Sequence, residues 1–337
     1  MGDDRRRTVD ARAQSRTRRR RAAGASRRHA ATHIALSAAL KRERRMRRRL
    51  ERAAVEQGVR GASCDADEAG RLQREEEFDD ELDAAIERGD FVLYLQPKVR
   101  PSDGSLAGAE ALVRWAHPER GMISPAAFIP ALERSGGILD LDLHMFEQAC
   151  ALEARWMREK GAALPLSVNL SRLHVHDDAF IERFARIAHR YGVAPGIIEM
   201  ELTESVFLDD EGIERVARAV REMHRHGFRC SLDDFGAGFS SLGLLARFDV
   251  DAVKLDRAFF LDETQRTRDV VETIVQLAHK LGVSAVAEGV ETPEQVAFLR
   301  SIGCDAVQGF VHAAPLSVDE FEAWACERYA EIPVCAR

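Results

Sequence analysis

Short stretches of apolar or alternating residues recur along the chain from Phe91 onward. These stretches are FVLYLQPKV (91–99), LAGAEALVRW (106–115), LPLSVNLS (164–171), IIEMELTES (197–205), RCSLDDFG (229–236), AVKLDRAF (252–259), SAVAEGVE (284–291) and AVQGFV (306–311). Most of them are separated by segments with helical periodicity, several of which end at a glycine, such as GIERVARAVREMHRHG (212–227). Strands that alternate with helices in this way predict an α/β fold, a (β/α)8 barrel of the TIM type.

The connection between the first two strands is too short for a parallel crossover. Only residues 100–105 separate them, whereas a parallel crossover needs about a dozen residues or more. The connection contains Asp103 and Gly104, a pair that is typical of tight hairpin turns. The first strand is therefore expected to run antiparallel to the second, which predicts a barrel with an antiparallel first strand.

The region before the barrel differs from it in charge. The chain has a net charge of −7, yet residues 1–60 contain 20 Lys or Arg and only 6 Asp or Glu. This Arg-rich segment is expected to be disordered or to form a basic helix. It would be a solvated tail or connector, or a contact for an anionic membrane or a nucleic acid. Otherwise it would be the remnant of a lost domain or the result of a wrongly assigned start codon. No aromatic residue precedes Phe78, so bases would have nothing to stack on.

Residues 61–74 are predicted to be a polar linker, and residues 75–330 the barrel. The barrel region opens with an amphipathic helix that carries Phe78, Leu82 and Ile86 at four-residue intervals. No apolar run approaches the roughly 18 residues that span a bilayer, and no secretory signal is apparent. The six cysteines are scattered without a CxxC pair, which favours reduced thiols and a cytoplasmic location.

Polar residues interrupt the apolar strands near their carboxyl ends, where barrel active sites lie. The residues at these positions are Asn169, Glu201, Asp233, Asp234, Lys254, Glu288 and Gln308, while Glu110 lies within the second strand of the hairpin. Ordinary polar strand ends would explain any one of them, but they explain poorly why so many point to one mouth.

Carboxylates that converge must become protonated or bind cations, because they otherwise repel each other. A ligand set of oxygen atoms from Asp, Glu and Asn suits hard cations such as Mg²⁺ or Mn²⁺. Two ions bridged by a shared aspartate suit the attack of water on a phosphodiester. The residues alone therefore indicate a metal-dependent phosphohydrolase.

The motif AEALVRW (109–115), followed by HPERGMISPAAFIP (117–130), resembles the signature of the EAL domain family of cyclic di-GMP phosphodiesterases. The resemblance extends from about residue 75 to 315 through LYLQP, FIPALERSG, SVNLS, ELTES, DDFGAGFSSL, VKLDR, AEGVET and GCDAVQGF. It implies hydrolysis of cyclic di-GMP to linear pGpG, in a barrel whose first strand is reversed. It also implies a homodimer in which the loop after Asp234 couples the interface to the metals.

The resemblance further implies a role for each matching residue. The first metal ion would be held by Glu110, Asn169, Glu201 and Asp233. The second would be held by Asp233, Asp234 and Glu288. Lys254 would orient the attacking water, Gln308 would complete the wall beside it, and Glu204 would hold the loop after Asp234. Gln96 and Arg114 would contact the substrate, Arg114 as a planar fork suited to a phosphate or a guanine edge.

Departures from the commonest family pattern occur at Ala237, Phe239, Asp249 and His312. None of them removes an implied metal ligand, so they bear on loop dynamics and turnover rather than on the chemistry. Two alternatives to the phosphodiesterase stay open. One is an inactive EAL domain that acts as a cyclic di-GMP receptor or a protein-binding module, and the other is a barrel that cleaves a different nucleotide phosphodiester.

Overall fold

The computed structural model describes residues 66–161, 163–177, 179–203, 210–236, 245–261 and 264–329. The chain divides into two compact units, Met1–Arg74 and Glu75–Arg337. The predictions made for residues 1–60 and for Glu204 lie outside the described residues.

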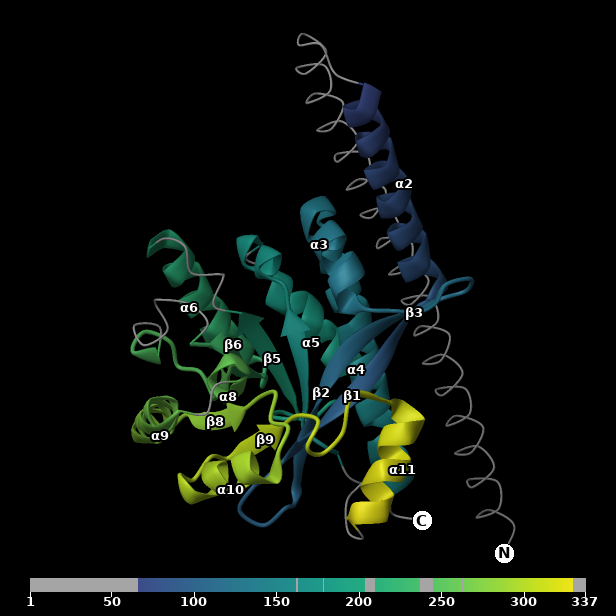
Figure 1. The fold of residues 1–337 in the computed structure, drawn as a ribbon. Helices are drawn as coiled ribbons and strands as arrows, with labels where there is room; N and C mark the ends of the chain where they lie inside the picture. Colours follow the sequence, from purple (N-terminus) through teal and green to yellow (C-terminus); the bar gives the residue numbers. More distant parts are fainter. Residues whose placement is uncertain are drawn as a thin grey trace, which may run out of the picture. The chain divides into compact units, whose positions relative to one another are not determined.

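A 10-stranded sheet forms the centre of the second unit (Figure 1). Its strands are β1 (Phe91–Val99), β2 (Leu106–His117), β3 (Gly121–Ile123), β4 (Leu166–Leu170), β5 (Ile198–Thr203), β6 (Arg229–Phe235), β7 (Ala252–Leu255), β8 (Ser284–Ala287), β9 (Ala306–Gln308) and β10 (Leu316–Ser317). The order is β10-β1-β9-β8-β7-β6-β5-β4-β2-β3, and a further pairing of β1 with β2 closes eight strands into a barrel. β1 runs antiparallel to β2 and β9, which confirms the predicted barrel with a reversed first strand.

The tight turn between β1 and β2 explains this reversal. The backbone N–H of Arg100 donates to Ser105 O at 2.8 Å, and the N–H of Gly104 donates to Arg100 O at 2.9 Å. Gly104 has a φ of 75°, a conformation that glycine adopts without steric cost. The Asp103 carboxylate accepts from the N–H of Ser105 at 2.9 Å. A turn of this size leaves no room for a crossover helix.

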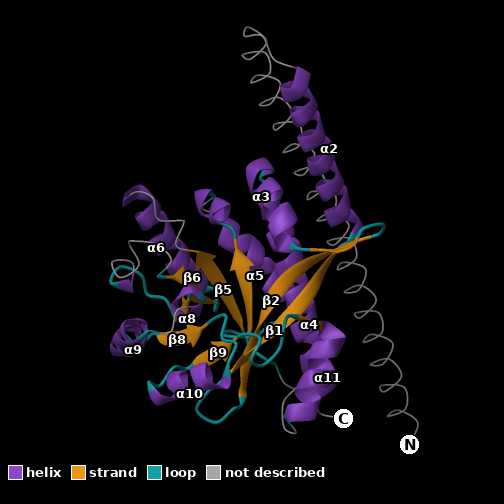
Figure 2. Ribbon diagram, in the orientation of Figure 1, coloured by secondary structure: helices purple, strands orange, loops and turns teal. Residues whose placement is uncertain are grey.

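Helices surround the barrel strands (Figure 2). They are α3 (Pro125–Ser135), α4 (Ile138–Lys160), the 3₁₀ helix η1 (Arg172–His176), α5 (Phe180–Tyr191), α6 (Asp210–Arg225), α8 (Ala258–Leu261), α9 (Gln265–Lys280), α10 (Pro293–Ser301) and α11 (Val318–Arg328). A further helix, α2 (Ala66–Arg88), precedes β1 in the chain. Because α2 begins at Ala66, the stretch predicted as a linker is helical from that residue onward. Within the described residues, no helix combines the length and the apolar content that crossing a bilayer requires.

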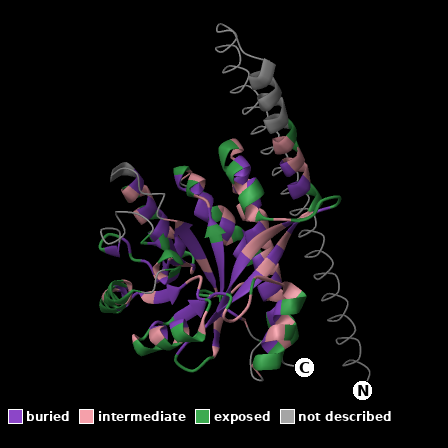
Figure 3. Ribbon diagram, in the orientation of Figure 1, coloured by how far each residue is buried: buried purple, intermediate pink, exposed green. Residues whose placement is uncertain are grey.

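The hydrophobic core lies between the outer face of the barrel and these helices, and Figure 3 shows the strands as mostly buried. The amphipathic end of α2 belongs to this core, because Leu82 and Ile86 are buried. Beside them, the ring of Trp115 stacks on Phe91 at 5.5 Å between centroids and contacts Phe78 at 6.1 Å. Each large apolar side chain that is fully buried contributes about 1.5–3 kcal/mol, so this packing holds the hairpin against the rest of the unit.

Several strands end earlier than the apolar pattern predicts. β7 stops at Leu255, because the Asp256 carboxylate accepts from the N–H of Ala258 at 2.7 Å and starts α8. The strands β3 and β10 are absent from the prediction, since three and two residues are too few to show a pattern.

The cysteines only partly follow the expectation of reduced thiols. Cys150, Cys230 and Cys304 are free and buried, as small core residues often are. Cys326, on α11, is disulfide-bonded, which departs from the prediction.

Candidate active site

Polar side chains gather at the carboxyl ends of the parallel barrel strands and on the adjoining part of the hairpin. The described members of the predicted site are Gln96 on β1, Glu110 and Arg114 on β2, Asn169 on β4, Glu201 on β5, Asp233 and Asp234 on β6, Lys254 on β7, Glu288 directly after β8, and Gln308 on β9. The sheet register pairs Gln96 with Glu110 and Asn169 with Glu201. The fold therefore brings together residues that lie up to about 210 positions apart in the sequence.

The ammonium of Lys254 is the centre of this group, and its side chain is 1% exposed. Four carboxylates surround its Nζ, with distances of 2.7 Å to Glu201 Oε2, 2.6 Å to Glu288 Oε1, 3.1 Å to Asp233 Oδ1 and 3.6 Å to Glu110 Oε2. These carboxylates come from four different strands or strand ends. One lysine thus holds together four of the five acids that the family resemblance implies as metal ligands.

Lys254 stays positively charged in this environment. Burial alone disfavours an ammonium, but the carboxylates of Glu110, Glu201, Glu288 and Asp233 outweigh burial and raise the pKa of Lys254 well above its ordinary value. A lysine held in this state cannot accept a proton near neutral pH. Its chemistry is therefore that of a fixed positive charge and a hydrogen-bond donor.

The four carboxylates differ from each other in how readily they ionise. Burial would raise the pKa of Glu201, but Lys254 and Lys98 together hold it well below its usual range. Burial raises the pKa of Glu110 and of Asp233, and it raises the pKa of Glu288 to about 8. The ammonium groups of Lys254 and Lys98 are therefore too little positive charge for four buried acids, and such a cluster attracts further cations.

Amide side chains support one of these acids, Glu110. Asn169 Nδ2 donates to Glu110 Oε1 at 2.8 Å, and Gln308 Nε2 donates to Glu110 Oε2 at 2.5 Å. Gln308 Nε2 also lies 3.0 Å from Gln96 Oε1, and Gln96 Nε2 donates to Ala313 O at 3.2 Å. Gln308 Oε1 is a buried acceptor without a hydrogen-bond partner among the described residues. It is therefore available to a ligand or to water.

Arg114 lies on the same face of β2 as Glu110, because the two residues are four positions apart on one strand. Its guanidinium lies over the ring of Tyr94, 5.6 Å from the centroid, and Nη1 donates to Val113 O at 2.8 Å. Burial lowers the pKa of Arg114, while the charge of Glu110 acts in the opposite direction. Arg114 thus lies nearer to the carboxyl end of β2 than Glu110 does.

The backbone between Asp233 and Phe235 is irregular. Asp234 has a φ of 54°, which is uncommon for a residue other than glycine. The pairing of β6 with β7 shifts register over the same residues, and such bulges redirect side chains near active sites. Asp233 is buried, Asp234 is exposed, and the charge of Asp234 adds to the effects that raise the pKa of Asp233.

A second layer of polar residues lies beneath the acids, and the sequence did not predict it. Lys98, Ser167 and Glu199 each precede or follow a predicted site residue by two positions, and Lys98 and Ser167 are buried. Because strand residues two apart share a face, the alternation could have identified them. They were missed because a residue inside an apolar strand is ordinarily taken for core.

The chemistry of the donor set fits a hard divalent cation. Among the described residues, no three acidic, histidine or cysteine side chains already surround a position for a metal ion. The countercharge between the acids is the Lys254 ammonium. Carboxylate and amide oxygens are the ligands that Mg²⁺ and Mn²⁺ prefer, and three of the four acids have a raised pKa that added positive charge would relieve.

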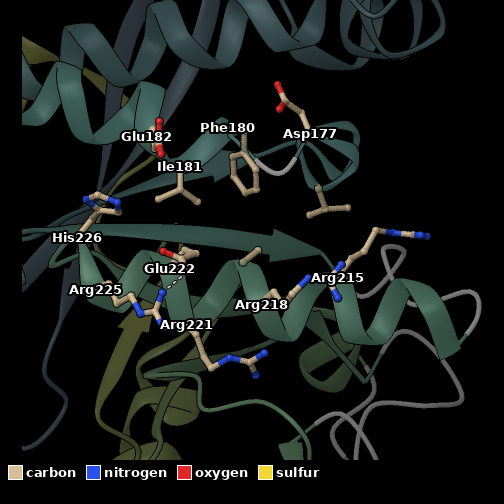
Figure 4. A pocket seen from close by; sticks show the side chains of 12 residues that line it. Asp177, Phe180, Ile181, Glu182, Arg215, Arg218, Arg221, Glu222, Arg225 and His226 are labelled. Atoms are coloured by element: carbon tan, nitrogen blue, oxygen red, sulfur yellow. Dashed lines mark hydrogen bonds and ion pairs between the residues drawn. The ribbon is translucent and has the colours of Figure 1, made fainter.

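A groove of about 570 Å³ lies away from this cluster, between α5 and α6 (Figure 4). α5 contributes Phe180 and Ile181 to one side of the groove, while α6 contributes arginines to the other. None of the site residues that the structure describes lines this groove.

Comparisons with known proteins agree with the motifs. The family model described as EAL domain matches residues 79–315. The chain is 36% identical over 249 residues to the cyclic di-GMP phosphodiesterase PdeR of Escherichia coli, which covers 73% of this chain and 37% of PdeR. It is 34% identical over 255 residues to the cyclic di-GMP phosphodiesterase NbdA of Pseudomonas aeruginosa, covering 75% of this chain and 32% of NbdA.

Solved structures show the same fold. The structure described as PaMucR phosphodiesterase in complex with c-di-GMP superimposes with a TM-score of 0.67 and is 32% identical in sequence. The match covers 73% of this chain and 99% of that one. The chain spans about a third of the length of the curated relatives PdeR and NbdA.

Proposed function

Because the chain belongs to the EAL domain family, we propose that it hydrolyses cyclic di-GMP to linear pGpG and that it needs Mg²⁺ or Mn²⁺ to do so. The observation that carries this proposal is the ring of Glu110, Glu201, Asp233 and Glu288 around Lys254. A domain that only bound the nucleotide would have no need for four buried acids at one mouth. The names of the relatives PdeR and NbdA support the same substrate.

Two divalent ions are proposed to bind among these acids. The first would take oxygen ligands from Glu110, Asn169, Glu201 and Asp233. The second would take them from Asp233, Asp234 and Glu288, so Asp233 would be a ligand of both. Such ions, when bound, would polarise the phosphoryl group of the substrate and activate a water molecule.

Lys254 is proposed to orient the attacking water and to offset negative charge that develops on the phosphoryl oxygens. Its raised pKa supports a permanently charged role rather than that of a general base. In the reaction, a new bond forms between the water oxygen and phosphorus while the bond from phosphorus to the 3′ oxygen breaks. The water supplies the proton that the 3′ oxygen ends with, and the 5′ phosphate of pGpG remains.

The rest of the pocket is proposed to bind and orient the nucleotide. Arg114 can offer a planar pair of N–H donors to a phosphate or a guanine edge. Gln96 would contact the substrate beside it, and Gln308 would complete the wall near the water, with its buried Oε1 as an acceptor. Glu204 would hold the loop after Asp234, and this role stays a prediction because Glu204 lies outside the described residues.

The partners and location of the chain are also proposals. We propose a homodimer that the loop after Asp234 links to the active site. A protein whose mass in solution is strictly that of a monomer at full activity would contradict the dimer. A cytoplasmic location follows from the substrate, which is an intracellular messenger. An anionic membrane or nucleic-acid contact of residues 1–60 stays a hypothesis.

Product analysis tests the function directly. Purified protein is incubated with cyclic di-GMP in Mg²⁺, in Mn²⁺ or in a chelator, and pGpG is measured by chromatography. Production of pGpG only in the presence of metal is expected. Tight binding of cyclic di-GMP without product would instead support the receptor alternative. Cleavage of another nucleotide diester in preference to cyclic di-GMP would support a different substrate.

A further inference from the structure

A buried lysine lies inside the barrel directly beneath the acid ring. Lys98, on β1, is 7% exposed, and its Nζ lies 2.8 Å from Ser167 Oγ, 3.0 Å from Glu201 Oε1 and 3.5 Å from Glu199 Oε1. The interior of such a barrel is ordinarily filled by branched apolar side chains. A charged group in this position has to be paired, because burying it alone would cost several kcal/mol.

The two oxygens of Glu201 are shared between two lysines. Oε2 accepts from Lys254 at 2.7 Å, while Oε1 accepts from Lys98 at 3.0 Å. Ser167 also hydrogen-bonds to this carboxylate, and the Glu201 side chain has no exposed area. With both oxygens engaged, the carboxylate cannot rotate without breaking at least one charged hydrogen bond. Oε2 is the oxygen that contacts Lys254 at the centre of the acid ring.

Lys98 is itself fixed from several sides. In the sheet register it lies opposite Gly108 and Gln308, so its backbone is held on both edges of β1. Glu199 pairs with it from below, and the other oxygen of Glu199 lies 3.8 Å from Nη2 of Arg229. A lysine anchored in this way can hold a carboxylate in one orientation.

We propose that Lys98 is a positioning residue for Glu201, which it clamps through Oε1 so that Oε2 alone is presented to a metal ion. The proposal rests on the proposed function only in taking Glu201 as a metal ligand. Groups that orient a metal ligand in this manner typically affect metal affinity by about 10–100-fold when they are removed.

The sign of the effect separates positioning from simple electrostatics. A lysine that acted only through its charge would repel a nearby cation, so replacing it with an uncharged residue would tighten metal binding. If Lys98 positions Glu201, replacing it weakens metal binding instead. Without Lys98, Glu201 turns away or pairs both of its oxygens with Lys254. A lysine that served stability alone would lower the unfolding temperature and leave the affinity of the folded protein unchanged.

The test is Mn²⁺ binding to the nucleotide-free protein, measured by electron paramagnetic resonance. The variant Lys98→Met keeps the length of the side chain without its charge. Lys280→Met makes the same change at an exposed position of α9 and is the matched control. We expect Lys98→Met to weaken Mn²⁺ binding about tenfold or more and Lys280→Met to leave it unchanged. Circular dichroism and thermal unfolding in chelator check that each variant is folded.

A second variant, Ser167→Ala, removes a partner of both Lys98 and Glu201 and changes no charge. It is expected to weaken Mn²⁺ binding a few-fold. If Lys98→Met does not fold, Ser167→Ala provides the test of the positioning role. Unchanged or tighter binding in the folded variant, or no Mn²⁺ binding by the wild type, would overturn the proposal. Because no nucleotide is present, a wild type that binds Mn²⁺ but yields no pGpG contradicts the proposed function alone.

Discussion

The Nζ of Lys254 lies 2.7 Å from Oε2 of Glu201, and neither side chain is more than 1% exposed. This buried pair joins β7 to β5 across the barrel mouth, over the intervening strand β6. Lys254 also reaches Glu110, Asp233 and Glu288. Lys254 therefore contributes to the stability of the metal-free protein and also fixes the arrangement of the acids.

Removing the Lys254 charge should destabilise the metal-free protein. In Lys254→Met the four surrounding carboxylates lose their common partner, and loss of one partner from a buried ion pair costs about 3–5 kcal/mol. The free energy of unfolding, measured by urea denaturation in chelator, is expected to fall by that amount. Lys280→Met, at an exposed position, serves as the control. Equal stability of the two variants would contradict the central role of Lys254.

Glu153, on α4, should make the stability depend on pH. It is 2% exposed, and burial raises its pKa from the ordinary 4.5 to about 8, against an opposing effect of the Leu164 backbone. Between these values the folded protein binds the proton more tightly than the unfolded chain. Glu153 therefore lowers stability progressively as pH rises through this window, by up to about 1.4 kcal/mol for each pH unit.

The variant Glu153→Gln should remove this dependence. We expect it to be more stable than the wild type at pH 8 and to match the wild type near pH 4.5, when unfolding free energies are compared across the range. Glu159→Gln changes an exposed residue of the same helix and should follow the wild type at every pH. A constant difference between Glu153→Gln and the wild type would count against a buried acid with a raised pKa.

Most residues of the acid ring could be predicted from the sequence, because both the fold and the type of side chain point to the same positions. Strands that alternate with helices send their carboxyl ends to one mouth, so Glu201, Asp233 and Lys254 could be placed there without a structure. The hairpin was predictable from Asp103 and Gly104, since a six-residue connection permits nothing else.

Other features depend on packing that no local pattern reveals. Lys98 and Ser167 look like ordinary strand residues, and only the closed barrel shows that they meet Glu201. The sequence could not show that a single ammonium, that of Lys254, lies among all four acids, because their separations depend on side-chain orientation. The short strand β3 was missed because its pairing with β2, rather than its composition, makes it a strand.

Arg114 should affect substrate affinity but not metal affinity. The variant Arg114→Lys keeps the charge and loses the planar fork. Losing one charge-assisted hydrogen bond costs about 1.5 kcal/mol, so KM for cyclic di-GMP should rise about tenfold. The Mn²⁺ affinity of the nucleotide-free protein should stay as it is. Arg134→Lys, at an exposed position of α3, is the control, and an unchanged KM in Arg114→Lys would remove Arg114 from the substrate site.

The most direct measurement is the formation of pGpG by the wild type and by Asp233→Asn, with Mg²⁺ or Mn²⁺ present. Asp319→Asn makes the same substitution at an exposed position of α11 and is the matched control. We expect the wild type and Asp319→Asn to convert cyclic di-GMP to pGpG, and Asp233→Asn to be slower on the order of 100-fold or more. No pGpG from the wild type, or equal rates for all three proteins, would contradict the account.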